Sequence, residues 1–194
     1  MGRTRSSSET EAAESDAVRV VGIDPGTLVT GWAVVEGPFG SATPLGYGTW
    51  RLRGSLSARL HQMSRSLAEL LAQYEPDVVA LERNFAGNNV QSALRLGEAR
   101  GAILAAVGAC TLEVAEYTPA TVKLAVAGSG RATKRQVQVM VMRLLHLRRE
   151  PAVDAADALA VALCHLQNAS FAQRLRQAQS AWRAVRTRVK RLPS

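Results

Sequence analysis

Four acidic residues of this chain have the types and spacing of a divalent-metal site that could hydrolyse phosphodiesters. Asp24 and Glu82 each come at the end of a short valine-rich run, and Asp154 and Asp157 lie three positions apart near the end of the chain. Hard divalent cations prefer oxygen ligands, and a two-metal site must hold both the attacking and the leaving oxygen. The four carboxylates are therefore candidate metal-binding and catalytic residues.

The two valine-rich runs are typical of buried strands. Residues 18–23 end at an Asp-Pro-Gly turn, and residues 77–81 end just before a turn-rich stretch. If the two strands are parallel neighbours, Asp24 and Glu82 lie at the same edge of the sheet, where α/β folds place their sites. Glu82 could equally be a solvated charge at a strand end, without a function.

The other two acids fall in a helical pattern that begins near Ala152. Three positions apart, Asp154 and Asp157 share one helix face, about 4.5 Å apart along the axis. Asp154 alone would also suit an acid near a helix N-terminus, where the helix dipole favours negative charge. Asp157 is harder to explain in this way, because an alanine-rich apolar segment follows it and buried acids are rarely left unpaired.

The remaining pattern predicts an α/β domain with a mixed sheet and helices on its faces. An antiparallel pair opens the sheet, and strands then alternate with helices. The antiparallel pair is expected at residues 31–36 and 45–52, helices at 57–74 and 90–107, a strand at 112–117, and further helices starting near Pro119, Thr133 and Ala152.

The charge of the chain predicts a polyanionic partner. Its 194 residues carry a formal net charge of +8, and no acidic residue follows Asp157. The last segment is a candidate nucleic-acid contact, although a basic run can also be a solvated helix or bind another partner. Its cationic residues are Arg174, Arg176, Arg183, Arg186, Arg188, Lys190 and Arg191.

A single compact domain is expected, with a tail at each end. Residues 1–17 are rich in Ser and Glu and predict a disordered tail, residues 18–168 the folded domain, and residues 169–194 a basic helix or tail. Cys110 and Cys164 match no metal or disulfide pattern. With neither a signal peptide nor a transmembrane run in the sequence, we expect a cytoplasmic protein.

Several strings, in order, resemble one known family. VVGIDPGTLVTGWAVVE, LERNFAGNNVQSALRLGEARGAIL, EYTPATVKLAVAGSGRATKRQVQVMVMRLL and DAADALAVALCH together resemble RuvC-type Holliday junction resolvases over about residues 18–168. The resemblance implies a ribonuclease H-like α/β fold, with a mixed five-stranded sheet and helices on both faces. It also implies a homodimeric endonuclease that resolves four-way junction DNA by paired symmetric cuts in recombination and repair.

The resemblance assigns roles to particular residues. The metal-binding acids of the family match Asp24, Glu82, Asp154 and Asp157. Two Mg²⁺ ions per subunit are expected, and Mn²⁺ is expected to substitute for them. The branch-migration proteins RuvA and RuvB are expected partners.

Five further residues are candidate DNA-binding residues. Phe85 matches a family phenylalanine that stacks on bases near the junction centre, although a loop phenylalanine can also pack into the core. Lys123 and Lys134 match lysines near the catalytic face, but lysines on helices are often only solvated. Arg83 flanks Phe85 and favours its exposure, and Arg131 follows a Gly-Ser-Gly turn whose N–H groups could face a phosphate.

Three other functions fit parts of the sequence. An actin-like sugar or acetate kinase also uses an Asp-x-Gly-Thr turn, as at residues 24–27, but such kinases need two domains of this kind. A non-catalytic junction-binding module would keep the basic surface, although the complete set of acids argues against lost activity. A related nuclease that acts on RNA remains an alternative.

Overall fold

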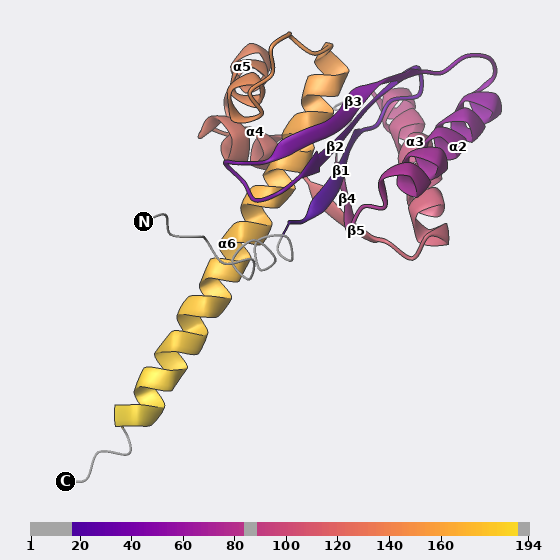
Figure 1. The fold of residues 1–194 in the computed structure, drawn as a ribbon. Helices are drawn as coiled ribbons and strands as arrows, with labels where there is room; N and C mark the ends of the chain where they lie inside the picture. Colours follow the sequence, from indigo (N-terminus) through magenta and orange to yellow (C-terminus); the bar gives the residue numbers. More distant parts are fainter. Residues whose placement is uncertain (1–16, 84–88, 190–194) are drawn as a thin grey trace, which may run out of the picture.

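The computed structural model describes residues 17–83 and 89–189, with side chains described as far as Ala172. Its centre is one five-stranded sheet of order β3-β2-β1-β4-β5, seen nearly edge-on in Figure 1. This confirms the predicted mixed five-stranded sheet. The strands are β1 (Arg19–Asp24), β2 (Val29–Glu36), β3 (Thr43–Arg51), β4 (Val78–Glu82) and β5 (Glu113–Tyr117).

The direction of the strands sets up the functional edge of the sheet. β1, β2 and β3 form an antiparallel meander, whereas β4 runs parallel to both β1 and β5. Ile23 is paired with Leu81. The next residues, Asp24 and Glu82, therefore end two adjacent parallel strands at the same edge. The expectation that these strands are parallel neighbours is confirmed.

Helices cover both faces of the sheet, as predicted (Figure 1). One face packs against α2 (Leu56–Tyr74) and α3 (Val90–Ala109), and the other against α4 (Pro119–Ala127), α5 (Lys134–Leu144) and α6 (Val153–Val189). Because side chains of a strand alternate between faces, Val21 and Ile23 of β1 enter the first core, whereas Val20 enters the second.

Local sequence explains where these helices begin. Ser55, Thr118 and Thr133 are the N-caps of α2, α4 and α5, and each accepts a hydrogen bond from a backbone N–H of the first turn. Pro119 starts α4 at a position where no N–H partner is needed. The predicted helices near Pro119 and Thr133 thus have the caps that their sequence supplies.

Two glycines let α6 lie directly on the strands. A Cβ at Gly22 of β1 would come within 2.2 Å of the backbone oxygen of Ala158, and one at Gly31 of β2 within 1.9 Å of that of Asp154. No other residue fits at these distances without moving the helix or the strand. The glycines therefore bring the start of α6, with its two aspartates, close to the end of β1.

α6 continues far beyond the packed domain. In Figure 1 its N-terminal part crosses the sheet and its C-terminal part projects away from the rest of the molecule. The helix passes the predicted boundary at residue 168 without a break. Apart from Ala17, the predicted N-terminal tail, residues 1–17, lies outside the described residues.

The residues that the structure describes include no helix that is long and apolar enough to span a membrane.

Candidate active site

The carboxylates of Asp24 and Glu82 belong to the face of the sheet that α6 covers. In β1, Val20 and Gly22 face α6, and in β4, Val78 and Ala80 enter the same core. Alternation along each strand then places Asp24 and Glu82 on this face too. Both side chains are partly buried. Two acids from neighbouring strands therefore converge under the start of α6.

A buried threonine fixes the turn that follows Asp24. Thr30 is fully buried, and its hydroxyl donates a hydrogen bond of 2.7 Å to the backbone oxygen of Gly26. The sulfur of Met63 lies 3.4 Å from the same hydroxyl. The hydroxyl therefore ties the Asp-Pro-Gly-Thr turn to the beginning of β2. This contact limits the movement of the backbone next to the Asp24 carboxylate.

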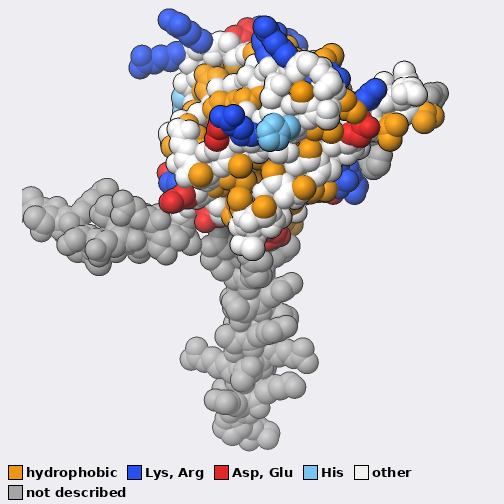
Figure 2. Space-filling view, turned by 90° about the vertical axis from the view of Figure 1, so that its right-hand side faces the viewer, with side chains coloured by type: hydrophobic (Ala, Val, Ile, Leu, Met, Phe, Trp, Pro, Cys, Tyr) orange, Lys and Arg blue, Asp and Glu red, His pale blue; other side chains and the backbone are white. Residues whose placement is uncertain are grey.

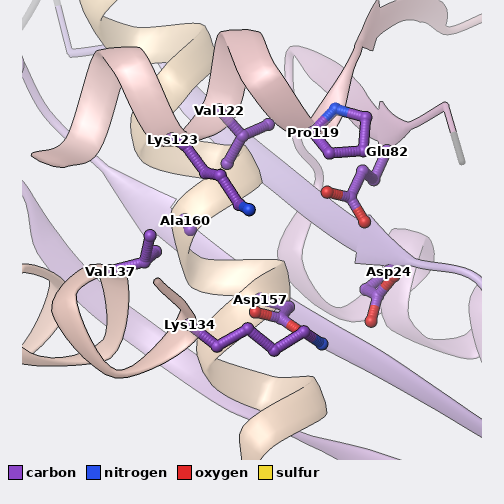
Figure 3. A pocket seen from close by; sticks show the side chains of 9 residues that line it. All are labelled: Asp24, Glu82, Pro119, Val122, Lys123, Lys134, Val137, Asp157 and Ala160. Atoms are coloured by element: carbon purple, nitrogen blue, oxygen red, sulfur yellow. The ribbon is translucent and has the colours of Figure 1, made fainter. Parts of the chain in front are cut away.

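Asp157 of α6 joins the two strand-end acids in one hollow of about 170 Å³. Figure 3 shows the three carboxylates with Lys123 and Lys134 around this hollow, which lies between the sheet, α4, α5 and α6. The lining residues are Asp24, Glu82, Pro119, Val122, Lys123, Lys134, Val137, Asp157 and Ala160.

The fourth predicted acid, Asp154, does not line this hollow. It lies one helical turn before Asp157, with its backbone against Gly31, and its side chain is partly buried. Gly31 is paired with Asp24 across β1 and β2. Asp154 is thus at the rim of the site, whereas the other three acids face its interior.

Burial and repulsion between the acids perturb Asp24. Its pKa is raised to about 8, mainly by burial and further by the negative charges of Glu82 and Asp157, while Lys134 opposes the rise. Desolvation and like charges both disfavour the ionised form of a carboxyl group. Without a further cation, the site therefore keeps a proton on the coupled pair of Asp24 and Glu82 near neutral pH.

Lys134 is the positive charge closest to an acid in this site. Its Nζ donates a hydrogen bond of 2.9 Å to Oδ2 of Asp157. This bond is the main cause that raises the pKa of Lys134, and the charges of Asp157, Asp24 and Glu82 add to it. Lys123 approaches from α4 on the other side of the hollow (Figure 3). The two lysines bring positive charge to the hollow, which favours a phosphate beside the acids.

The donor set suits hard divalent cations. Three carboxylates from β1, β4 and α6 face one hollow, and a cation among them would relieve the repulsion that holds the proton near Asp24. As the side chains lie, no three Asp, Glu, His or Cys residues within 17–83 and 89–172 are close enough together to hold one ion. An ion held by all three carboxylates would therefore require them to move closer together.

Two of the remaining predicted DNA-binding residues, Arg83 and Arg131, are not among the residues that line the hollow. Phe85 falls outside the described residues. Arg83 directly follows Glu82, is exposed, and its backbone N–H bonds to the oxygen of Tyr117. Arg131 is exposed in the loop before α5 and lines a different hollow, on the other side of that helix.

His165 does not reach the acids. Its Nδ1 lies 2.9 Å from the hydroxyl of Tyr117, at the end of β5. Burial lowers the pKa of this histidine, and the same cause raises the pKa of Tyr117 to about 12. Both groups therefore stay neutral near pH 7. The pair ties the edge strand to α6, two turns beyond Asp157.

Three residues that position the acids were not predicted from the sequence. Gly22 and Gly31 set the approach of α6, and Thr30 holds the turn after Asp24. A signal for the glycines exists, since a glycine inside a valine-rich strand often marks the close approach of another backbone. Nothing in the sequence marks the buried Thr30.

A family model described as "Crossover junction endodeoxyribonuclease RuvC" matches residues 20–165, which contain all four acids. The chain belongs to this RuvC family. A RuvC of Magnetococcus marinus is 47% identical over 163 residues, covering 83% of this chain and 91% of the relative. A RuvC of Halorhodospira halophila is 52% identical over 155 residues, covering 78% and 92%.

A solved RuvC structure shares the fold. Thermus thermophilus RuvC, in complex with a Holliday junction substrate, matches with a TM-score of 0.76 and 33% identity, over 80% of this chain and 96% of that one. The ribonuclease H-like α/β fold that the sequence predicted is therefore confirmed. The family model ends at residue 165, so most of the projecting part of α6 lies beyond it.

Proposed function

We propose that this chain is a structure-specific endonuclease that resolves Holliday junctions by paired symmetric phosphodiester hydrolysis, in DNA recombination and repair. The observation that carries the proposal is the hollow in which Asp24, Glu82 and Asp157 meet two lysines. Membership of the RuvC family supports it, as does the likeness to a relative whose structure contains a Holliday junction.

The acids are proposed to hold two Mg²⁺ ions per subunit, which Mn²⁺ can replace. Asp24, Glu82 and Asp157 face the hollow, and Asp154 at its rim is one helical turn away on the same helix. When bound, such ions activate water and stabilise the charge on the attacking and leaving oxygens. The described residues that line the hollow include carboxylates and neither Cys nor His, a set that favours Mg²⁺ or Mn²⁺ over softer metals.

The lysines and the turn are proposed to place the DNA. Lys123 and Lys134 approach the hollow from α4 and α5, where each can neutralise part of the charge of a phosphate. The bond from Thr30 to Gly26 keeps the Asp24 carboxylate in position while the phosphate enters. The apolar side chains of Val122 and Val137 form part of the wall and limit the water around the reacting groups.

Two symmetric cuts require two active sites, so we propose a homodimer whose twofold axis matches that of the junction. The N-terminal half of α3 offers a surface for it, since Val90 is 81% and Leu94 57% exposed. Gly97 and Gly101 follow at helical spacing and are exposed too, so a second helix can approach closely. Figure 2 shows hydrophobic side chains across the middle of the side that carries α2 and α3.

The dimer surface can be tested apart from the chemistry. Leu94→Arg places a charge on the exposed apolar part of α3, and Leu94 is not one of the residues that line the hollow. We expect sedimentation to show a dimer for the unchanged chain and a monomer for the variant. A variant that still sediments as a dimer would place the interface elsewhere.

The expected partners follow from the same activity. We propose that the branch-migration proteins RuvA and RuvB act on the same junctions, and that the protein works in the cytoplasm with the chromosomal DNA. The basic balance of the chain, with a net charge of +8, is that of a protein with a polyanionic substrate.

Cleavage of a labelled mobile four-way junction in Mg²⁺ tests the proposed function directly. We expect symmetric cuts on two opposing strands, and no cuts in a linear duplex of the same sequence or in an RNA hairpin. Asp157→Asn, which removes one carboxylate of the hollow, serves as the inactive control. Preferential cutting of the RNA hairpin, or no cutting of the junction, would overturn the proposal.

A further inference from the structure

A second hollow, of about 540 Å³, lies on the far side of α5 from the candidate active site. The first hollow uses Lys134 and Val137 of this helix. Residues of a helix follow one another at about 100°, so Gln136 and Arg143 point to another side. The second hollow is lined by Ala127, Ser129, Arg131, Ala132, Thr133, Arg135, Gln136, Val139, Met140 and Arg143.

The charge of this second hollow is positive throughout. Arg131, Arg135 and Arg143 line it, and none of its lining residues in the described part of the chain is acidic. Arg135 is paired with Glu150. Within residues 17–83 and 89–172, the guanidinium groups of Arg131 and Arg143 have no hydrogen-bond or ion-pair partner. A guanidinium group has five N–H donors in a planar fork, which suits the oxygens of a phosphate.

One helix, α5, contributes side chains to both hollows. From Lys134 to Arg143 the helix rises about 13 to 14 Å, at about 1.5 Å per residue. One strand of B-DNA rises about 3.4 Å per phosphate, so this length corresponds to about four phosphates. A strand whose scissile phosphate lies beside Lys134 can therefore reach the arginines of the second hollow without leaving the surface of α5.

We propose that the second hollow binds the sugar–phosphate backbone of the DNA a few nucleotides from the scissile phosphate. The proposal rests on the proposed function, and it adds a site to it. Unpaired arginines recognise phosphate charge and geometry, and the apolar Val139 and Met140 beside them contribute no base-specific hydrogen bond. The hollow therefore strengthens binding to every sequence and holds the register of the strand in the active site.

Junction binding in EDTA, where no strand is cut, tests the site by fluorescence anisotropy. We expect Arg131→Gln combined with Arg143→Gln to weaken binding about tenfold at 0.1 M salt, and to reduce the slope of log K against log salt by nearly two, since each lost phosphate contact removes about 0.9. Arg143→Lys should keep the slope, because it keeps the charge. Arg65→Gln is the control for loss of a surface charge, since Arg65 is also exposed but is paired with Glu69 on α2, on the opposite face of the sheet.

A neutral methylphosphonate, placed at one position of the strand at a time, locates the contact. Substitution three to five nucleotides from the cut should weaken binding by the unchanged chain, and should add little to the loss in the double variant, because the two changes remove one interaction. Thermal unfolding checks that the variant is folded, which the exposure of both arginines leads us to expect.

The outcomes separate this site from the proposed function. If the unchanged chain cuts junctions while the double variant binds them with unchanged affinity and salt slope, the second hollow is not a DNA site and the proposed function stands. Binding of an acidic protein there instead would give this same result. If the unchanged chain neither binds nor cuts junctions, the proposed function fails first.

Discussion

Nζ of Lys134 lies 2.9 Å from Oδ2 of Asp157, inside the hollow where the acidic residues converge. The lysine side chain is 72% exposed and that of the aspartate 19%. A pair this exposed contributes little to the free energy of folding. The ion pair matters for metal binding instead, since the ammonium group of Lys134 is bonded to a carboxylate oxygen that a divalent ion would need.

Replacing this lysine should therefore improve metal binding while it impairs cleavage. We expect Lys134→Met to bind Mn²⁺ a few-fold more tightly in the absence of DNA, because one competing positive charge is gone and its effect is reduced by solvent. Calorimetric titration with Mn²⁺ measures this directly. Junction cleavage by the same variant should be slower, because the phosphate loses a cationic contact.

Lys123 is the matched control for this experiment. It lines the same hollow from α4, but no carboxylate of the site is hydrogen-bonded to it. Lys123→Met should leave Mn²⁺ affinity within error, although cleavage should fall. Weaker Mn²⁺ binding in the Lys134 variant would show that its ammonium group does not compete with the ion.

Asp24 makes stability depend on pH in the absence of metal. Its pKa in the folded chain is about 8, against about 3.9 when unfolded, so between these values the unfolded chain releases a proton that the folded chain retains. The free energy of unfolding of the metal-free protein therefore falls as pH rises from about 4 to about 8. Asp24→Asn removes this loss.

Thermal unfolding in EDTA checks this prediction. The Asp24→Asn variant should melt at a higher temperature than the unchanged chain at pH 8 and above, and the difference should shrink toward pH 4. Added Mn²⁺ should stabilise the unchanged chain more than the variant, because the ion binds only the folded state. A variant that is less stable than the unchanged chain at pH 8 would contradict the view that the buried, repelled charge of Asp24 destabilises the metal-free fold.

Asp157 is predicted to matter for chemistry and not for DNA binding. We expect Asp157→Asn to lower junction cleavage by more than about 100-fold, since even residues that only support metal ligands change activity by about 10- to 100-fold. Junction affinity in EDTA should stay the same or rise, because one negative charge near the DNA is lost. Single-turnover cleavage and anisotropy measure the two effects separately. Unchanged cleavage in Mg²⁺ would show that Asp157 has no catalytic role.

Much of the site was predictable because its acids end elements with strong sequence signals. Valine-rich runs followed by turn residues predicted the ends of β1 and β4, and the parallel pairing of these two strands, which the prediction took as a condition, brings Asp24 and Glu82 to one edge. The pairing of Lys134 with Asp157 was not predictable, since it depends on how α5 packs against α6. Spacing along a chain indicates which side chains share a helix face, but not which helix lies beside it.

The position of Asp154 shows the same limit. Its spacing from Asp157 predicted a shared helix face, and both residues do lie at the start of α6. Only the packing of that helix against Gly31 places Asp154 at the rim while Asp157 faces the hollow. Whether a residue faces a hollow or lies at its rim depends on the distances between packed elements. The periodicity of the sequence carries no information on these distances.

The close approach of α6 to β1 gives the last prediction. A Cβ at residue 22 would lie 2.2 Å from the oxygen of Ala158, directly after Asp157, so Gly22→Ala must push α6 away from β1. Overpacking of this kind lowers the free energy of unfolding by about 1–3 kcal/mol. The contact is between two backbones, which cannot change rotamer to relieve it as a side chain can. We expect a lower melting temperature, weaker Mn²⁺ binding and slower cleavage together.

Gly108→Ala is the control for this substitution. Gly108 lies near the end of α3, where no atom of the described residues is near enough to meet a Cβ, and alanine favours a helix, so stability should be unchanged or slightly higher. The informative comparison is Mn²⁺ affinity at a temperature where both variants are fully folded. If Gly22→Ala then binds the ion as tightly as the unchanged chain, the separation of α6 from β1 does not control the distance between Asp157 and Asp24. If binding is weaker, the glycine acts on the metal site through the position of the helix.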